Sequence, residues 1–223
     1  MVYVTGDMHG EQEKLLAAER DTPLREGDTL IVCGDFGYIF RNDERERAFL
    51  DEVENRPYTL CFVDGNHENF PAIYAYPEEI WNGGRVHRIR KNIYHLMRGQ
   101  VFQLEDKRVF TMGGAYSIDR HFRTEGVSWW PEERPCREEY DEATRNLLAC
   151  GKKVGYILTH TMPLKTIRQG GWFPDPHDLE LTSYLEWILY QVQYQHWYCG
   201  HFHADCDLPG KITLMWNAVM PME

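Results

Sequence analysis

The chain has 223 residues, a formal net charge of −11 at pH 7, and 43% hydrophobic and 26% charged residues. This balance predicts a water-soluble globular protein that is long enough for a well-buried core. The sequence contains no run of about 18 apolar residues, which argues against a membrane-spanning helix. Its acidic charge argues against a non-specific nucleic-acid binder.

The first third of the sequence alternates predicted strands and helices. Short apolar runs predict buried strands, and amphipathic stretches between them predict helices. The strands are expected at 2–5, 30–33 and 59–63, and the helices at 11–20, 43–55 and 71–76. This order is typical of a parallel sheet with crossover helices. Because the first strand begins at residue 2, there is no room for a signal peptide, and we expect a cytoplasmic protein.

From Trp81 onward the apolar runs become shorter and closer together. Runs at 86–89, 93–96, 101–104 and 109–112 predict an antiparallel meander in a second sheet, packed on the first. The irregular segment 113–135 contains Trp129 and Trp130, which either fill the core or wall a substrate pocket. Later elements are expected as helices at 137–150 and 181–192, a loop at 161–176, and strands at 154–159, 197–199 and 212–216. In the absence of repeats or linkers, we expect a single domain over residues 1–223.

Metal-binding types of side chain follow five of the predicted strands. Asp35, for example, comes after the apolar run 30–33 and Gly34. One such Asp is often only a turn or cap residue, but the pattern recurs at four other strand ends. The five motifs are Asp7-Met8-His9, Gly34-Asp35, Gly65-Asn66-His67-Glu68, Thr159-His160 and Gly200-His201-Phe202-His203. Because ligands bind beyond the carboxyl ends of strands in α/β sheets, the pattern predicts a metal site at one sheet edge.

The predicted metal ligands combine carboxylate, imidazole and amide donors without a thiolate: Asp7, His9, Asp35, Asn66, His160, His201 and His203. Seven ligands are too many for one tetrahedral zinc site, whereas two sites that share a ligand fit the number. These donors suit two divalent ions of Mn, Fe, Zn or Co. Two such ions can hold a hydroxide between them and clamp a phosphoryl group. Asp35 is the natural shared ligand, because its two carboxylate oxygens can serve both ions.

His67 and Glu68 directly follow the predicted ligand Asn66. With Asn66 facing the metal, the ring of His67 can face the leaving group and act as general acid. Glu68 is then predicted to orient that imidazole and to stabilise its charge.

Taken together, the five motifs resemble the signature of the calcineurin-like metallophosphoesterase superfamily, and the resemblance extends over nearly the whole chain. It implies a four-layer α/β/β/α sandwich, in which two mixed β-sheets are flanked by helices and the dimetal site lies at the strand ends. It also implies a distribution of roles. Asp7, His9 and His203 would hold one ion, Asn66, His160 and His201 the other, with Asp35 bridging them and His67 assisting the leaving group.

The sequence departs from one branch of that superfamily. Its protein phosphatases and diadenosine tetraphosphatases carry a phosphate-gripping arginine in a Gly-Asp-x-Val-Asp-Arg-Gly motif, whereas Phe36-Gly37-Tyr38 follows Asp35 here. Four arginines could replace it, namely Arg41, Arg98, Arg120 and Arg123. Of these, Arg120 is predicted to bind substrate, because it lies in the loop that begins at Gly113-Gly114.

The leading hypothesis is a metal-dependent phosphoesterase that hydrolyses phosphomonoesters or phosphodiesters of a small molecule or nucleotide. One alternative is a non-catalytic metal-binding scaffold, but such a protein is expected to lose ligands or His67, and all are present. Another is a nuclease, which the acidic charge disfavours unless residues 85–91 supply a local basic strip. No membrane partner is expected, and the oligomeric state is left open.

Overall fold

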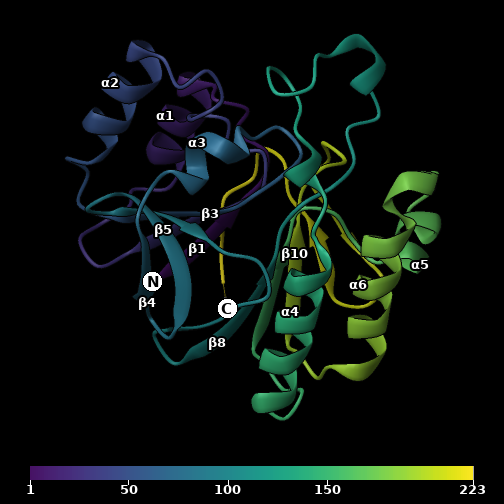
Figure 1. The fold of residues 1–223 in the computed structure, drawn as a ribbon. Helices are drawn as coiled ribbons and strands as arrows, with labels where there is room; N and C mark the ends of the chain where they lie inside the picture. Colours follow the sequence, from purple (N-terminus) through teal and green to yellow (C-terminus); the bar gives the residue numbers. More distant parts are fainter. Residues whose placement is uncertain (223) are drawn as a thin grey trace.

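The computed structural model describes residues 1–222, which form two mixed β-sheets packed face to face (Figure 1). The first sheet contains β1 (Val2–Thr5), β2 (Thr29–Cys33), β3 (Thr59–Val63), β4 (Glu78–Trp81), β5 (Gly84–Arg90), β6 (Ile93–Leu96) and β13 (Met220–Pro221). The second contains β7 (Val101–Leu104), β8 (Lys107–Met112), β9 (Tyr156–Thr159), β10 (His196–Cys199), β11 (Cys206–Leu208) and β12 (Ile212–Leu214). Their strand orders are β13-β1-β2-β3-β6-β5-β4 and β11-β12-β10-β9-β8-β7.

Helices cover the outer face of each sheet. The first sheet carries α1 (Gln12–Asp21), α2 (Glu44–Val53) and α3 (Phe70–Tyr74), and the second carries α4 (Arg137–Ala149), α5 (Leu164–Gln169) and α6 (Leu179–Gln191) (Figure 1). Short 3-10 turns lie at Arg120–Phe122, Pro131–Glu133 and Pro176–Asp178. The predicted four-layer sandwich is confirmed.

The apolar run of β2 is buried on both faces of its sheet. Ile31 and Cys33 belong to the core between the two sheets, while Leu30 and Val32 pack under the helices of the first sheet. This division follows from the alternation of side chains along a strand. It explains why the run is continuously apolar rather than alternating.

The prediction of a single meander in the second sheet is wrong for its first half. β5 and β6 belong to the first sheet, where β6 pairs in parallel with β3 through Leu60 and Ile93. All four residues of β6 are buried, which suits an interior strand. Only β7 and β8 lie in the second sheet, so the chain changes sheets between Leu96 and Val101. The structure also contains α5 inside the expected loop 161–176, and the short strands β4, β11 and β13 were not predicted.

The strand directions bring five strand ends to one edge of the sandwich. β1, β2 and β3 run parallel to one another, and so do β9 and β10. The loops that follow these strands therefore meet at the carboxyl edge, where the five motifs of the sequence lie.

Candidate metal centre

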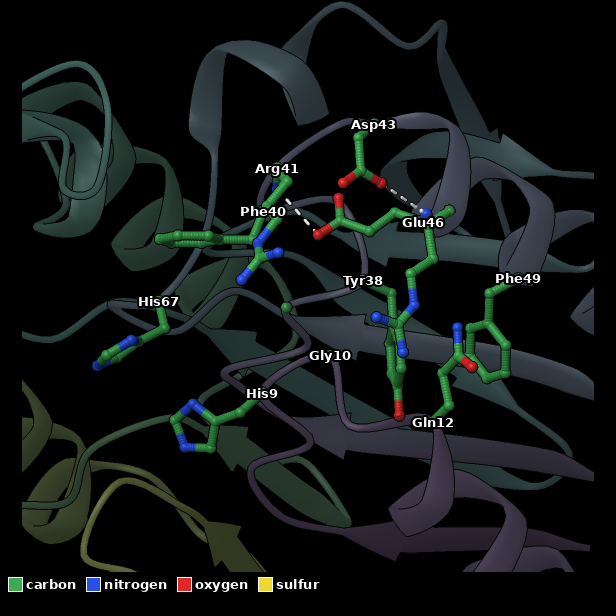
Figure 2. Close-up of a pocket in the computed structure, with 12 residues that line it drawn as sticks. His9, Gly10, Gln12, Tyr38, Phe40, Arg41, Asp43, Glu46, Phe49 and His67 are labelled. Carbon is green, nitrogen blue, oxygen red and sulfur yellow. Dashed lines mark hydrogen bonds between the residues drawn. The ribbon is translucent and has the colours of Figure 1, made fainter.

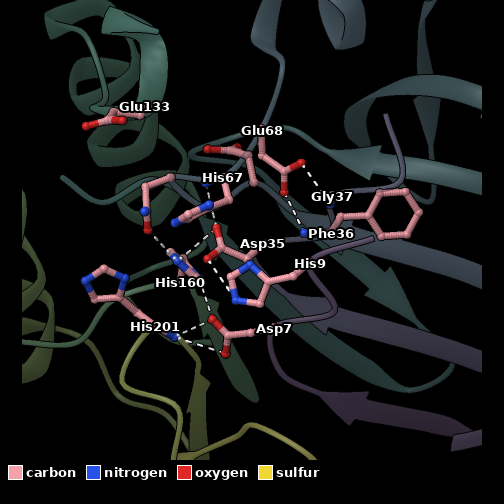
Figure 3. A network of polar contacts seen from close by, with 12 residues as sticks. Asp7, His9, Asp35, Phe36, Gly37, His67, Glu68, Glu133, His160 and His201 are labelled. Carbon is pink, nitrogen blue, oxygen red and sulfur yellow. Dashed lines mark hydrogen bonds and ion pairs between the residues drawn. The ribbon is translucent and has the colours of Figure 1, made fainter. Parts of the chain in front are cut away.

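One group of ligand atoms comes from Asp7, His9, Asp35 and His203, and these atoms all lie within 4.8 Å of one another. The Nε2 atoms of His9 and His203 are 3.0 Å apart, and Oδ1 of Asp7 is 3.7 Å from Nε2 of His203. Figure 3 shows Asp7, His9 and Asp35 pointing toward a common centre. Imidazole and carboxylate donors that converge in this way fit a divalent cation, and these four residues would hold it.

The other three predicted ligands, Asn66, His160 and His201, lie beside this group. Nε2 of His160 is 3.0 Å from the side-chain oxygen of Asn66, and the rings of His160 and His201 are 5.0 Å apart between centroids. Nδ1 of His160 lies 3.0 Å from the backbone oxygen of Cys33. A carbonyl oxygen only accepts, so Nδ1 donates and Nε2 is left as the ligand atom of the neutral ring.

The carboxylate of Asp35 lies between the two groups. Its Oδ2 is 3.6 Å from Nε2 of His9, and its Oδ1 is 3.3 Å from Nε2 of His160. The backbone N–H of His67 donates to the same Oδ1 at 2.8 Å, which fixes the carboxylate in place. This position is the one expected of a ligand that two ions share.

Four predicted ligands have a left-handed backbone conformation. The φ angles are 51° for His9, 49° for Asp35, 75° for His201 and 48° for His203. Such values are uncommon outside glycine and cost free energy, and they cluster where function requires a particular side-chain direction. The surrounding contacts, such as the bond from the His201 N–H to Asp7 Oδ1 at 3.0 Å, hold the loops in this state.

Two glycines of the motifs make room for neighbouring ligands. A Cβ atom on Gly34 would lie 2.0 Å from Nδ1 of His160, and one on Gly65 would lie 2.1 Å from Oδ1 of Asp35. Any side chain at these positions would displace a ligand of the adjacent strand end.

The electrostatics of the cluster favour neutral rings at His9 and His201 and a positive charge beside Asp7 and Asp35. Burial lowers the pKa of His9 to about 4 and that of His201 to about 3, so both rings are neutral at pH 7. Burial raises the pKa of Asp7 to about 6. For His160, burial opposes the charged form, but Asp35 and Asp7 outweigh it and raise the pKa to about 10. A proton on His160 thus supplies the positive charge that a bound cation would supply instead.

His67 lies at the edge of the cluster. Its ring meets that of His9 at a centroid distance of 5.0 Å, and Nη2 of Arg123 is 2.9 Å from its Nε2. Burial lowers the pKa of His67, and the Arg123 charge acts in the same direction. A bound phosphate dianion beside the ring would favour the protonated form and so offset this shift.

Glu68 is positioned differently from the prediction. Its two carboxylate oxygens accept hydrogen bonds from the backbone N–H groups of Phe36 and Gly37, at 2.7 and 3.2 Å (Figure 3). The side chain is fully buried, and a buried carboxylate requires such donors. Glu68 therefore braces the loop after Asp35, while the contact to the ring of His67 comes from Arg123.

Arg120 also differs from the prediction, because its guanidinium group is engaged inside the 113–135 segment. It pairs with the buried carboxylate of Glu133 at 2.5 Å and stacks on the rings of Tyr116 and Trp129. The side chain is thus committed to the shape of the loop. Ser117 of the same segment accepts a hydrogen bond from the Asn66 side chain at 3.1 Å. The segment therefore forms a wall of the site.

Arg98 and the basic strip have partners of their own. Arg98 is buried against Asp64, at 2.8 Å from Nε to Oδ2, and also donates to Glu139 at 3.0 Å. Each of Arg85, Arg88 and Arg90 pairs with a carboxylate. Nothing in this arrangement favours the nuclease alternative.

A scan against protein-family models matches the calcineurin-like phosphoesterase family over residues 1–205. The chain belongs to this family. The match covers all five motifs and the five strands that they follow, so the metallophosphoesterase resemblance seen in the sequence is confirmed. No curated protein sequence is similar enough to count as a match. Among residues 1–222 no helix is long and apolar enough to cross a membrane.

A cavity of about 360 Å³ opens next to the metal-ligand cluster of this family member. His9 and His67 line the end beside the cluster, and the other lining residues include Tyr38, Phe40 and Arg41. Figure 2 shows the Arg41 guanidinium group directed into the space beside the two histidines. The volume of the cavity lies within the range of small-molecule sites, about 300–1,000 Å³.

Proposed function

We propose that this calcineurin-like phosphoesterase is a dinuclear metal-dependent hydrolase of phosphomonoesters or phosphodiesters, with small molecules or nucleotides as substrates. The observation that carries the proposal is the position of Asp35 between two groups of ligand atoms. Mn, Fe, Zn or Co ions fit these donors. Divalent ions held there would offset phosphoryl charge and lower the pKa of the attacking water.

The chain's own residues supply the remaining steps. The walls formed by the 113–135 segment and by the loop after Asp35 orient the ester over the ligand cluster. His67, at the edge of the cluster, donates a proton to the leaving oxygen. Arg123, 2.9 Å from the His67 ring, holds the ring in place, and Glu68 keeps the Asp35 loop rigid through two backbone hydrogen bonds.

The test is hydrolysis of p-nitrophenyl phosphate and bis(p-nitrophenyl) phosphate by metal-stripped protein resupplied with Mn²⁺. We expect turnover of at least one ester, lost with chelator and lowered at least about 100-fold by Asp35→Asn, since even groups behind metal ligands contribute 10- to 100-fold. Asp51→Asn, on the exposed face of α2, is the matched control. Metal binding without turnover of either ester would favour the scaffold alternative instead.

A further inference from the structure

Two arginines that line the cavity, Arg41 and Arg45, have no ion-pair partner among residues 1–222. Both are exposed. By contrast, Arg123, which contacts the ring of His67, is paired with Asp119 at 2.7 Å. Guanidinium groups without an ion-pair partner beside a cavity are available to an anionic ligand. They place two positive charges at this position of a chain whose net charge is −11.

The carboxylates that also line the cavity are occupied by the backbone. Oδ1 of Asp43 accepts from the N–H of Glu46 at 2.9 Å, and the Glu46 carboxylate accepts from the N–H of Arg41 at 2.9 Å (Figure 2). The same carboxylate also accepts from the N–H of Asn42 at 2.6 Å. These bonds fix the residues around the start of α2. The two arginines are therefore presented from a rigid backbone, and neither of these carboxylates forms an ion pair with them.

We infer that the cavity binds a second phosphoryl group, carried by the leaving group of the substrate and held by Arg41 and Arg45. This inference rests on the proposed phosphoesterase function. Guanidinium groups match phosphate oxygens in a bidentate manner. A phosphomonoester carries about −1.5 to −2 charges at pH 7, which two guanidinium groups balance.

The cavity connects the two phosphoryl positions. His9 and His67 line its inner end, beside the ligand cluster where the scissile phosphate would lie. The rings of Tyr38 and Phe40 line the same cavity as the two arginines. The substrate class is thus a small organic bisphosphate whose carbon spacer packs against these rings.

The experiment compares alkyl monophosphates with α,ω-alkanediol bisphosphates of two to six carbons, using Mn²⁺-loaded protein. We expect kcat/KM to favour a bisphosphate by at least about tenfold over its matched monophosphate. Arg41→Gln and Arg45→Gln should each lower this ratio by about tenfold, because each removes charge-assisted hydrogen bonds. Arg20→Gln, an exposed arginine on α1 outside the cavity, is the control of equal charge change.

Calorimetric binding of the same ligands separates this inference from the proposed function. If no ester is hydrolysed, the function fails, while tighter bisphosphate binding that requires both arginines still supports the second phosphoryl site. If wild-type protein prefers no bisphosphate of any spacer length, the inference is overturned. The inference is also overturned if the arginine variants lose affinity for monophosphates and bisphosphates equally, because the arginines then hold the scissile phosphoryl group.

Discussion

At the scale of single residues, the site depends on side chains that serve two purposes. Asp35 contacts both groups of ligand atoms, accepts a backbone hydrogen bond from His67, and has a φ angle of 49°. The motif Gly-Asp predicts that a carboxylate ends the strand. It does not predict the left-handed conformation, since this depends on contacts made by residues far apart in the chain.

The role of His67 predicts a dependence on the leaving group. His67→Gln should lower kcat for an alkyl phosphate by about 10²- to 10⁴-fold, because an alkoxide requires protonation as it leaves. The loss should be much smaller for p-nitrophenyl phosphate, whose phenolate leaves without a proton. Steady-state rates on the two esters measure the difference. His196→Gln, at the start of β10 and so at the strand end away from the motifs, is the control. Equal losses on both esters would assign His67 to binding rather than to proton transfer.

At the scale of elements, a buried ion pair joins the end of β3 to the wall of the site. Arg98 pairs with Asp64, which follows β3, and also donates to the backbone oxygen of Glu132 at 2.7 Å and to Glu139 at 3.0 Å. The sequence offered Arg98 only as a phosphate ligand. Its partners lie 34 residues or more away in the chain, so local pattern could not identify this structural role.

Removal of Arg98 should therefore destabilise the protein. Arg98→Met removes the guanidinium partner of buried Asp64 and leaves this carboxylate only the imidazole of His95, at 3.0 Å. The substitution should lower the free energy of unfolding by about 3–5 kcal/mol at pH 7. The exposed pair of Arg88 with Glu79 provides the control, since Arg88→Met should cost at most about 1 kcal/mol. Urea denaturation measures both, and equal effects would contradict the assignment.

The ion pair of Arg98 with Asp64 also predicts how the stability lost in Arg98→Met depends on pH. Burial opposes ionisation of Asp64, but Arg98 outweighs it and holds the pKa of this carboxyl below its ordinary value. A carboxyl group whose pKa is lower in the folded than in the unfolded state stabilises the fold at any pH above the unfolded-state pKa, here about 3.9. This stabilisation is lost as the pH falls toward and through the folded-state pKa. The difference in the free energy of unfolding between wild type and Arg98→Met should therefore become smaller below about pH 4. Urea denaturation at a series of pH values measures it.

At the scale of the whole molecule, the site requires both sheets. The first sheet supplies Asp7, His9, Asp35 and Asn66 from the ends of β1, β2 and β3, and the second supplies His160, His201 and His203 from the ends of β9 and β10. Strand-end motifs predicted this convergence, because parallel strands present their carboxyl ends at one edge. The sequence did not reveal that β5 and β6 join the first sheet or that Arg120 is engaged by Glu133, since both depend on tertiary pairing.

The central claim is that these seven side chains hold two ions that share Asp35. Its most direct test is a titration of metal-free protein with Mn²⁺, followed by electron paramagnetic resonance. The account predicts two Mn²⁺ per chain and the spectrum of a spin-coupled pair, which Asp35→Asn converts to uncoupled ions or a single ion. Binding of one Mn²⁺ or none by the wild-type chain, or of two that show no coupling, would contradict it.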